Sequence, residues 1–222
     1  MNVTLPTVTT TDGISTLSLP ALPVASDDPQ ASEYAMVLAD GIDAAATATC
    51  GWVVDVQGNL GGNMWPMLSG VSALLPEGPV MFFRDRAVED TAVTVQEDGA
   101  GTEGMTFVGV GPRTQCDGAP IAVLQDRSTS SSGEAVLAAF RGLPNARSFG
   151  QSSSGYGSGN ATHVLSDGSR LTLTAAEFVD RGGEVLGDRP VDPDLPIRRD
   201  GGGGTDAAQA AARIWLQERG CP

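Results

Sequence analysis

The chain has 222 residues, 41% of them hydrophobic and 18% charged, which is enough to bury the core of a globular protein without metal or disulfide staples. Thirteen arginines stand against 27 acidic residues and there is no lysine, so the formal net charge is −14. A field of this sign repels nucleic acids and anionic membranes, and neither is an expected partner.

The first half of the chain alternates between expected strands and helices. Residues 13–22 alternate apolar and polar side chains, which predicts a strand. Asp28 and Pro29 are a good N-cap and first residue for an amphipathic helix that follows. Residues 51–56 (GWVVDV) are typical of a strand covered on both faces in a parallel sheet, and a buried helix is expected over residues 64–75.

The second half continues with shorter elements. Strands are expected at 80–86, 91–99, 105–111, 121–126 and 146–151, a helix at 133–144 and a loop at 152–160. Residues 162–180 predict a hairpin with Asp167 and Gly168 at its turn, and residues 205–220 predict a closing helix after a glycine-rich linker. This order of elements indicates an α/β fold.

In open α/β sheets, sites form beyond the carboxyl ends of the strands, and two such ends are rich in suitable residues. One is the polar stretch STSSSGEAV at 128–136, which lies between a buried strand and a helix. A serine at such a turn can act as a nucleophile, with the helix N–H groups stabilising a developing negative charge. A plain helix N-cap with spare serines explains the same pattern.

The other strand end is the glycine-rich turn GNLGG at 58–62. Adjacent glycines allow a backbone N–H to approach a substrate closely, although a tight turn needs them too. Two such turns at the ends of two apolar strands are more specific than either one, because one can supply the nucleophile and the other a second oxyanion donor.

Four segments, in the right order, resemble the tail-specific (C-terminal processing) protease family of serine peptidases. They are GWVVDVQGNLGGNMWPMLSGVSALLPEG, PIAVLQDRSTSSSGEAVLAAF, SFGQSSSGYGSGN and LSDGSRLTLTAAEFVDRGGEVLGDRPVDPDLPI. The likeness extends over roughly residues 13–197, which makes it far more specific than one motif.

The resemblance implies an α/β spiral of β-β-α units, shared with the ClpP and crotonase proteins, and hydrolysis of polypeptides through an acyl-enzyme. It implies Ser131 as the nucleophile, and the backbone N–H groups of Gly62 and Ser132 as the oxyanion hole. It also implies no cofactor and no metal, a catalytic core at residues 1–197 without the family's N-terminal segment, and a linker with a closing helix at 198–222.

The general base is where the sequence departs from the family pattern. Tyr156 stands where lysine-using members have their base, and a tyrosine is a poor base at neutral pH. The chain therefore resembles more closely the tricorn-like members, whose histidine precedes the first strand seen here. Gln57 also replaces the usual arginine.

Other candidates for a base or an orienting carboxylate are few. The only histidine, His163, is expected in a hairpin strand, where a structural or exposed role is the simpler interpretation. Glu177 and Glu184 are candidates for an orienting carboxylate, and solvated strand-end charges explain them equally well. Two alternatives to a peptidase follow: a relative that binds peptides or ligands without catalysis, and a fragment that lacks its base.

The remaining signals concern the compartment. A disulfide between Cys50 and Cys116 is one option if the protein is exported, and two buried thiols are the other. The single histidine and the absence of a CxxC pair argue against a zinc site. No apolar run is long enough to span a membrane, and the N-terminus does not look like a secretory signal, so the protein is either cytosolic or lacks its true beginning. The family resemblance instead implies an extracytoplasmic or secreted protein.

Overall fold

The computed structural model describes residues 3–197 and 204–222, with side chains from residue 207 onward in the second range. Its centre is a six-stranded sheet in the order β1-β2-β3-β8-β9-β12. The strands are β1 (Thr7–Thr11), β2 (Ile14–Ser18), β3 (Gly51–Asp55), β8 (Ile121–Gln125), β9 (Ala146–Gly150) and β12 (Leu195–Pro196). All neighbours from β2 to β12 pair in parallel, so the carboxyl ends of β3 and β8 meet at one edge of the sheet.

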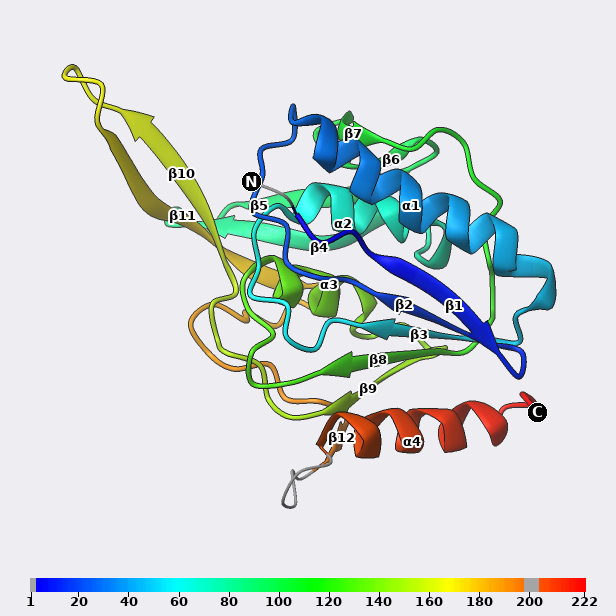
Figure 1. Ribbon diagram of the computed structural model, residues 1–222. Helices are drawn as coiled ribbons and strands as arrows, with labels where there is room; N and C mark the ends of the chain where they lie inside the picture. The colour runs from blue at the N-terminus through cyan, green and yellow to red at the C-terminus, as the bar shows by residue number, and fades with distance from the viewer. Residues whose placement is uncertain (1–2, 198–203) are drawn as a thin grey trace.

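Three helices cover one face of this sheet and a fourth covers the other (Figure 1). The first group comprises α1 (Pro29–Ala45), α2 (Met64–Gly70) and α3 (Ser132–Phe140), with two short 3₁₀ turns at Ala46–Ala48 and Ser72–Leu74. α4 (Gly204–Gln217) packs on the opposite face. Mixed α/β architecture is therefore confirmed.

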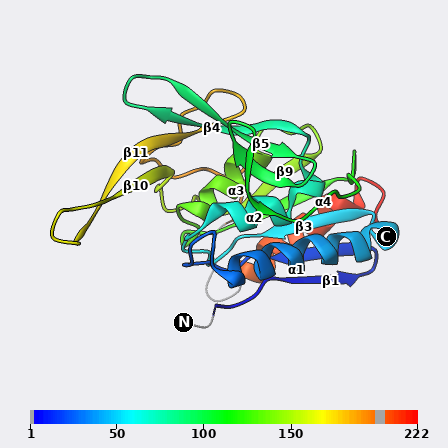
Figure 2. The ribbon, with the colours of Figure 1, turned by 90° about the horizontal axis from the view of Figure 1, so that it is seen from above.

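A second sheet, entirely antiparallel, packs on the outer side of α2 and α3. Its order is β10-β11-β4-β5-β6-β7, with β4 (Gly78–Asp85), β5 (Asp90–Gln96), β6 (Gly99–Thr102), β7 (Met105–Gly109), β10 (Ser158–Val164) and β11 (Arg170–Asp180). The β10–β11 hairpin extends away from the body in both views (Figures 1 and 2). The predicted turn at Asp167 and Gly168 is confirmed.

Local sequence explains most elements. The Asp28 side chain accepts a hydrogen bond from the backbone N–H of Gln30 at 2.9 Å, and Pro29 occupies the first turn of α1, both as expected. The apolar face of α1, with Tyr34, Leu38 and Ile42, is fully buried. No helix in the described ranges is long and apolar enough to cross a membrane.

Several expectations need correction. β1 and β6 were not expected, because a threonine-rich segment and a glycine-rich one lack the apolar alternation of a strand. β10 begins at Ser158, inside the expected loop, and α3 ends at Phe140, four residues before Pro144. The expected linker at 198–204 falls almost entirely outside the described residues.

The disulfide joins Cys50 to Cys221, and Cys116 is a free thiol. For Cys50, both options that the sequence left open, a bond to Cys116 and a buried free thiol, are therefore wrong. The physical reason is the sheet between Cys50 and Cys116. Cys50 packs with the apolar cluster on the α4 face, whereas Cys116 packs against the cluster on the face covered by α1, α2 and α3. The bond instead fastens the chain's last turn to the start of β3.

Candidate active site

The two turns that follow β3 and β8 are held against each other by hydrogen bonds. The Ser130 N–H donates to the Asn59 carbonyl at 2.9 Å, and the Thr129 hydroxyl donates to the Val56 carbonyl at 2.9 Å. The fully buried Asn59 side chain accepts from the Gly61 N–H at 2.8 Å. The serine stretch is therefore a rigid turn fixed to the glycine-rich turn, and not a flexible linker.

Ser131 is at the sharpest point of its turn, between β8 and α3. Its φ is +51° and its ψ is −111°, a conformation that costs a residue with a Cβ on the order of 1–3 kcal/mol. Such strain persists only where the surroundings fix it, which makes Ser131 a candidate for function. The side chain stands at the N-terminus of α3 and is partly exposed.

Two backbone N–H groups beside Ser131 are free to donate. Neither the N–H of Gly62 nor that of Ser132 has a hydrogen-bond partner within the described ranges. The Ser132 hydroxyl donates to the Gly62 carbonyl at 2.6 Å, so these two residues are fastened together. Preorganised N–H groups next to a nucleophile are the elements of an oxyanion hole.

The close approach of the two turns requires glycine. Gly61 and Gly62 have φ values of +100° and +119°. A Cβ on Gly61 would lie 2.8 Å from the Ser131 Cβ, and one on Gly62 would collide with the Leu22 carbonyl. The glycine pair therefore allows the backbone to lie directly against Ser131.

Glu134 fixes the turn that carries Ser131. It is fully buried, and its carboxylate accepts from the N–H groups of Ser131 at 2.8 Å, Gly155 at 2.8 Å and Tyr156 at 2.7 Å, and from the Ser153 hydroxyl at 2.5 Å. These four bonds occupy the oxygens that a base would need free. Sequence reasoning missed this role, although the Ser-x-x-Glu spacing of a capping box was visible.

The residues expected near the base lie elsewhere. The Tyr156 backbone belongs to the Glu134 cluster, but its side chain is 66% exposed. Glu177 is exposed on β11, with its carboxylate against Gly187. His163 is exposed on the projecting hairpin, opposite Leu171.

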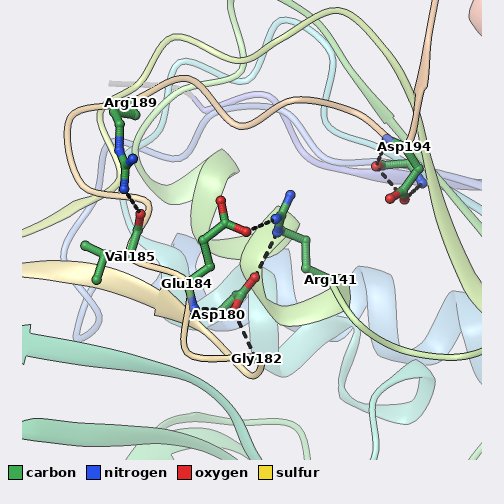
Figure 3. A network of polar contacts seen from close by, with 8 residues as sticks. Arg141, Asp180, Gly182, Glu184, Val185, Arg189 and Asp194 are labelled. Carbon is green, nitrogen blue, oxygen red and sulfur yellow. Dashed lines mark hydrogen bonds and ion pairs between the residues drawn. The ribbon is translucent and has the colours of Figure 1, made fainter.

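Glu184 forms part of a separate ion-pair cluster at the other end of α3 (Figure 3). Its carboxylate accepts from Arg141 at 2.7 Å, and the same guanidinium pairs with Asp180 at 3.0 Å. The structure therefore does not bring Glu184 to Ser131. Nor do the described ranges contain a group of three or more His, Cys, Asp or Glu side chains able to hold a metal ion.

Asp55, the last residue of β3, is a carboxyl whose charged form is disfavoured by burial. Burial raises the pKa of its carboxyl to about 6, and the nearby charge of Asp126 adds to the increase, although a hydrogen bond from the Gln57 N–H opposes it. The Asp126 carboxylate itself accepts from the Gly58 N–H at 3.0 Å and the Ser128 N–H at 2.9 Å.

A comparison with known protein families shows which family the chain belongs to. The model of peptidase family S41 matches residues 29–197, which include both turns. The chain belongs to this family. The tail-specific proteases that the sequence resembles are therefore its relatives, and the expected family is confirmed.

Individual relatives agree with the family match. The chain is 34% identical over 205 residues to the nisin-resistance protein of Lactococcus lactis subsp. lactis, covering 92% of this chain and 61% of that protein. A lipoprotein structure from Streptococcus agalactiae superposes with a TM-score of 0.79 at 26% identity, over 98% of this chain and 71% of that one.

The fold also resembles the photosystem II D1 C-terminal processing protease, with a TM-score of 0.59 at 19% identity, over 83% of this chain and 42% of that one. The chain thus spans less than two thirds of the nisin-resistance protein and less than half of the D1 protease.

Proposed function

We propose that this chain is the catalytic part of a serine peptidase in which Ser131 is the nucleophile. The Ser131 Oγ attacks the scissile carbonyl carbon, and the N–H groups of Gly62 and Ser132 hold the resulting oxyanion. The peptide C–N bond then breaks, the amine leaves with a proton, and water hydrolyses the acyl-enzyme. The observation that supports this most is the strained Ser131 beside two N–H groups that have no partner among the described residues.

The proton acceptor is proposed to lie outside the cluster around Ser131, as in the tricorn-like, lysine-free members. Glu134 has no free oxygen for this task, and Glu184 is engaged by Arg141. Tyr156, Glu177 and His163 remain secondary candidates. We also propose the finer fold assignment, a ClpP/crotonase-like spiral, with the catalytic core at residues 1–197 and the linker and closing helix at 198–222.

The proposed substrate is a polypeptide. The relative named as a nisin-resistance protein suggests nisin-like peptides as the first substrates to test. The proposed location is extracytoplasmic. A relative described as a lipoprotein supports it, and so does the Cys50–Cys221 disulfide, because disulfides persist in oxidising compartments. Thiol titration of the exported native protein should count one free thiol, and three after reduction.

The test is digestion of a peptide library by the full chain, with Ser131→Ala alongside and with imidazole added to replace a distant base. Cleavage should fall by about 10³-fold or more in Ser131→Ala, since a nucleophile contributes at least that much. Stimulation by imidazole would place the natural base outside the site.

The alternative is a relative that binds peptides without cutting them, favoured by the lack of a base beside Ser131 in the described ranges. This alternative predicts saturable peptide binding. Neither the unaltered chain nor the Ser131→Ala variant would then yield a cleavage product, with or without imidazole. Cleavage that is equal in the Ser131→Ala variant would instead overturn Ser131 as the nucleophile.

A further inference from the structure

A cleft of about 710 Å³ opens beside Ser131 and runs across the inner face of the second sheet. Its lining includes Ser131, Ser132 and Gly62, together with residues of α2 and of strands β4, β5, β6, β10 and β11 of the second sheet. A peptide whose carbonyl reaches Ser131 therefore has a neighbouring side chain within reach of this cleft.

The cleft carries no charge on any of its lining residues. The polar ones are serine, threonine and asparagine, and the apolar ones include Val24, Met64 and Ala176. This neutrality contrasts with the rest of a chain in which 18% of residues are charged and the net charge is −14. An ionised side chain placed here loses water and gains no countercharge, which is unfavourable.

Aromatic rings form the apolar wall. Phe83 lies between Trp65 and Phe178, with ring centroids 6.3 Å and 5.6 Å away. Trp65 also stacks on Phe107, with ring centroids 4.4 Å apart. Gly159 of β10 lies directly against Phe83, since a Cβ there would be 3.1 Å from its Cε1 atom. These contacts hold the aromatic rings together as one surface.

We propose that this cleft selects substrates with a large, uncharged apolar or aromatic side chain next to the scissile bond, with Trp65 and Phe83 as its contact surface and the buried Phe178 packed against Phe83. The proposal rests on the peptidase function proposed above and adds the substrate class. The proposed selection includes rejection of charged substrate side chains as well as binding of apolar ones. Burying an unpaired charge in the cleft weakens binding more than the loss of one methyl group does.

The test compares peptides that differ at one position beside the scissile bond, occupied by Phe, Ala, Asp or Arg. With the full chain and imidazole, we expect kcat/KM for Phe to exceed that for Asp and Arg by about 100-fold. In the Phe83→Arg variant, kcat/KM for the Asp peptide should exceed kcat/KM for the Phe peptide. Thr91→Arg, an exposed position paired with Phe83, repeats this reversal in a milder form should Phe83→Arg fail to fold. Leu171→Arg adds the same charge on the projecting hairpin outside the cleft and should leave the preference unchanged.

Calorimetric binding of the corresponding product peptides separates this proposal from the peptidase function. Peptides ending in Phe should bind at least about tenfold more tightly than those ending in Asp, whether or not the chain cleaves. Equal binding and equal cleavage of Phe and Asp peptides, with Ser131 still essential, would overturn the cleft assignment alone. Unchanged cleavage by the Ser131→Ala variant, with Phe peptides still bound more tightly than Asp peptides, would contradict Ser131 as the nucleophile and support the proposed selectivity of the cleft.

Discussion

The turn that carries Ser131 and the hairpin that carries His163 are built in opposite ways. From Thr129 onward the turn is partly to fully buried, it is strained at Ser131, and it is fixed by hydrogen bonds to Glu134, Asn59 and Val56. The hairpin extends into solvent with exposed side chains along most of its length. The difference indicates that the turn of Ser131, the proposed nucleophile, is tightly organised, while the only histidine of the sequence lies on an exposed hairpin.

Removing the charge of Glu134 should have the largest effect on folding. Glu134→Gln turns an amide NH₂ toward N–H donors that need an acceptor, so the free energy of unfolding should fall by about 3 kcal/mol. Cleavage should fall with it, because Ser131 loses its support. Urea unfolding measures the first and peptide digestion the second.

Glu177→Gln is the matched control for this variant, because Glu177 is an exposed glutamate with no hydrogen bond to the turn among the described residues. It should change stability by less than about 0.5 kcal/mol. Equal stability of the two variants would contradict a positioning role for Glu134.

The turn region and the hairpin tip should respond to pH with opposite sign. The pKa of Asp55 is raised to about 6 from an ordinary 3.8, so folding favours its protonated form, and its contribution to stability is lost as pH rises through this window. Asp55→Asn should therefore stabilise the protein by up to about 3 kcal/mol at pH 7 and by little at pH 4.

Hydrogen bonds from the Ser169 side chain and N–H lower the pKa of Asp167 at the hairpin tip. Its contribution is present above the ordinary pKa and is lost as pH falls, so Asp167→Asn should slightly destabilise the protein at pH 7. Urea titrations at pH 4 and 7 measure the change in the free energy of unfolding for both variants. A change of the same sign in both variants at pH 7 would contradict the predicted difference between the two regions.

Backbone strain at Ser131 gives a smaller effect. Glycine tolerates a φ of +51° and alanine does not, so Ser131→Gly should be more stable than Ser131→Ala by about 1 kcal/mol. Both should be inactive. Thermal unfolding of the pair measures the difference, and a more stable alanine variant would show that the turn is relaxed.

The smallest effect is expected at the hairpin. His163→Gln should change stability by less than about 0.5 kcal/mol, since the side chain is exposed. Cleavage should remain unchanged. A large loss of kcat in this variant would mean that the hairpin folds over the site and that His163 is the base.

Local pattern predicted the elements that position the site. The apolar runs before each turn, the N-cap at Asp28 and the hairpin turn at Asp167 depend on residues close in sequence, and the family resemblance then singled out Ser131. What failed depends on distant contacts. The pairing of Cys50 with Cys221 follows from which face of the sheet each thiol occupies, and the role of Glu134 follows from a loop about 20 residues away.

Covalent labelling of the full chain with a fluorophosphonate, followed by mass mapping, tests the central claim most directly. With imidazole present, we expect one adduct, on the peptide that contains Ser131, retained in Ser130→Ala and absent in Ser131→Ala. No adduct, or an adduct that persists in Ser131→Ala, would contradict the claim that Ser131 is the nucleophile.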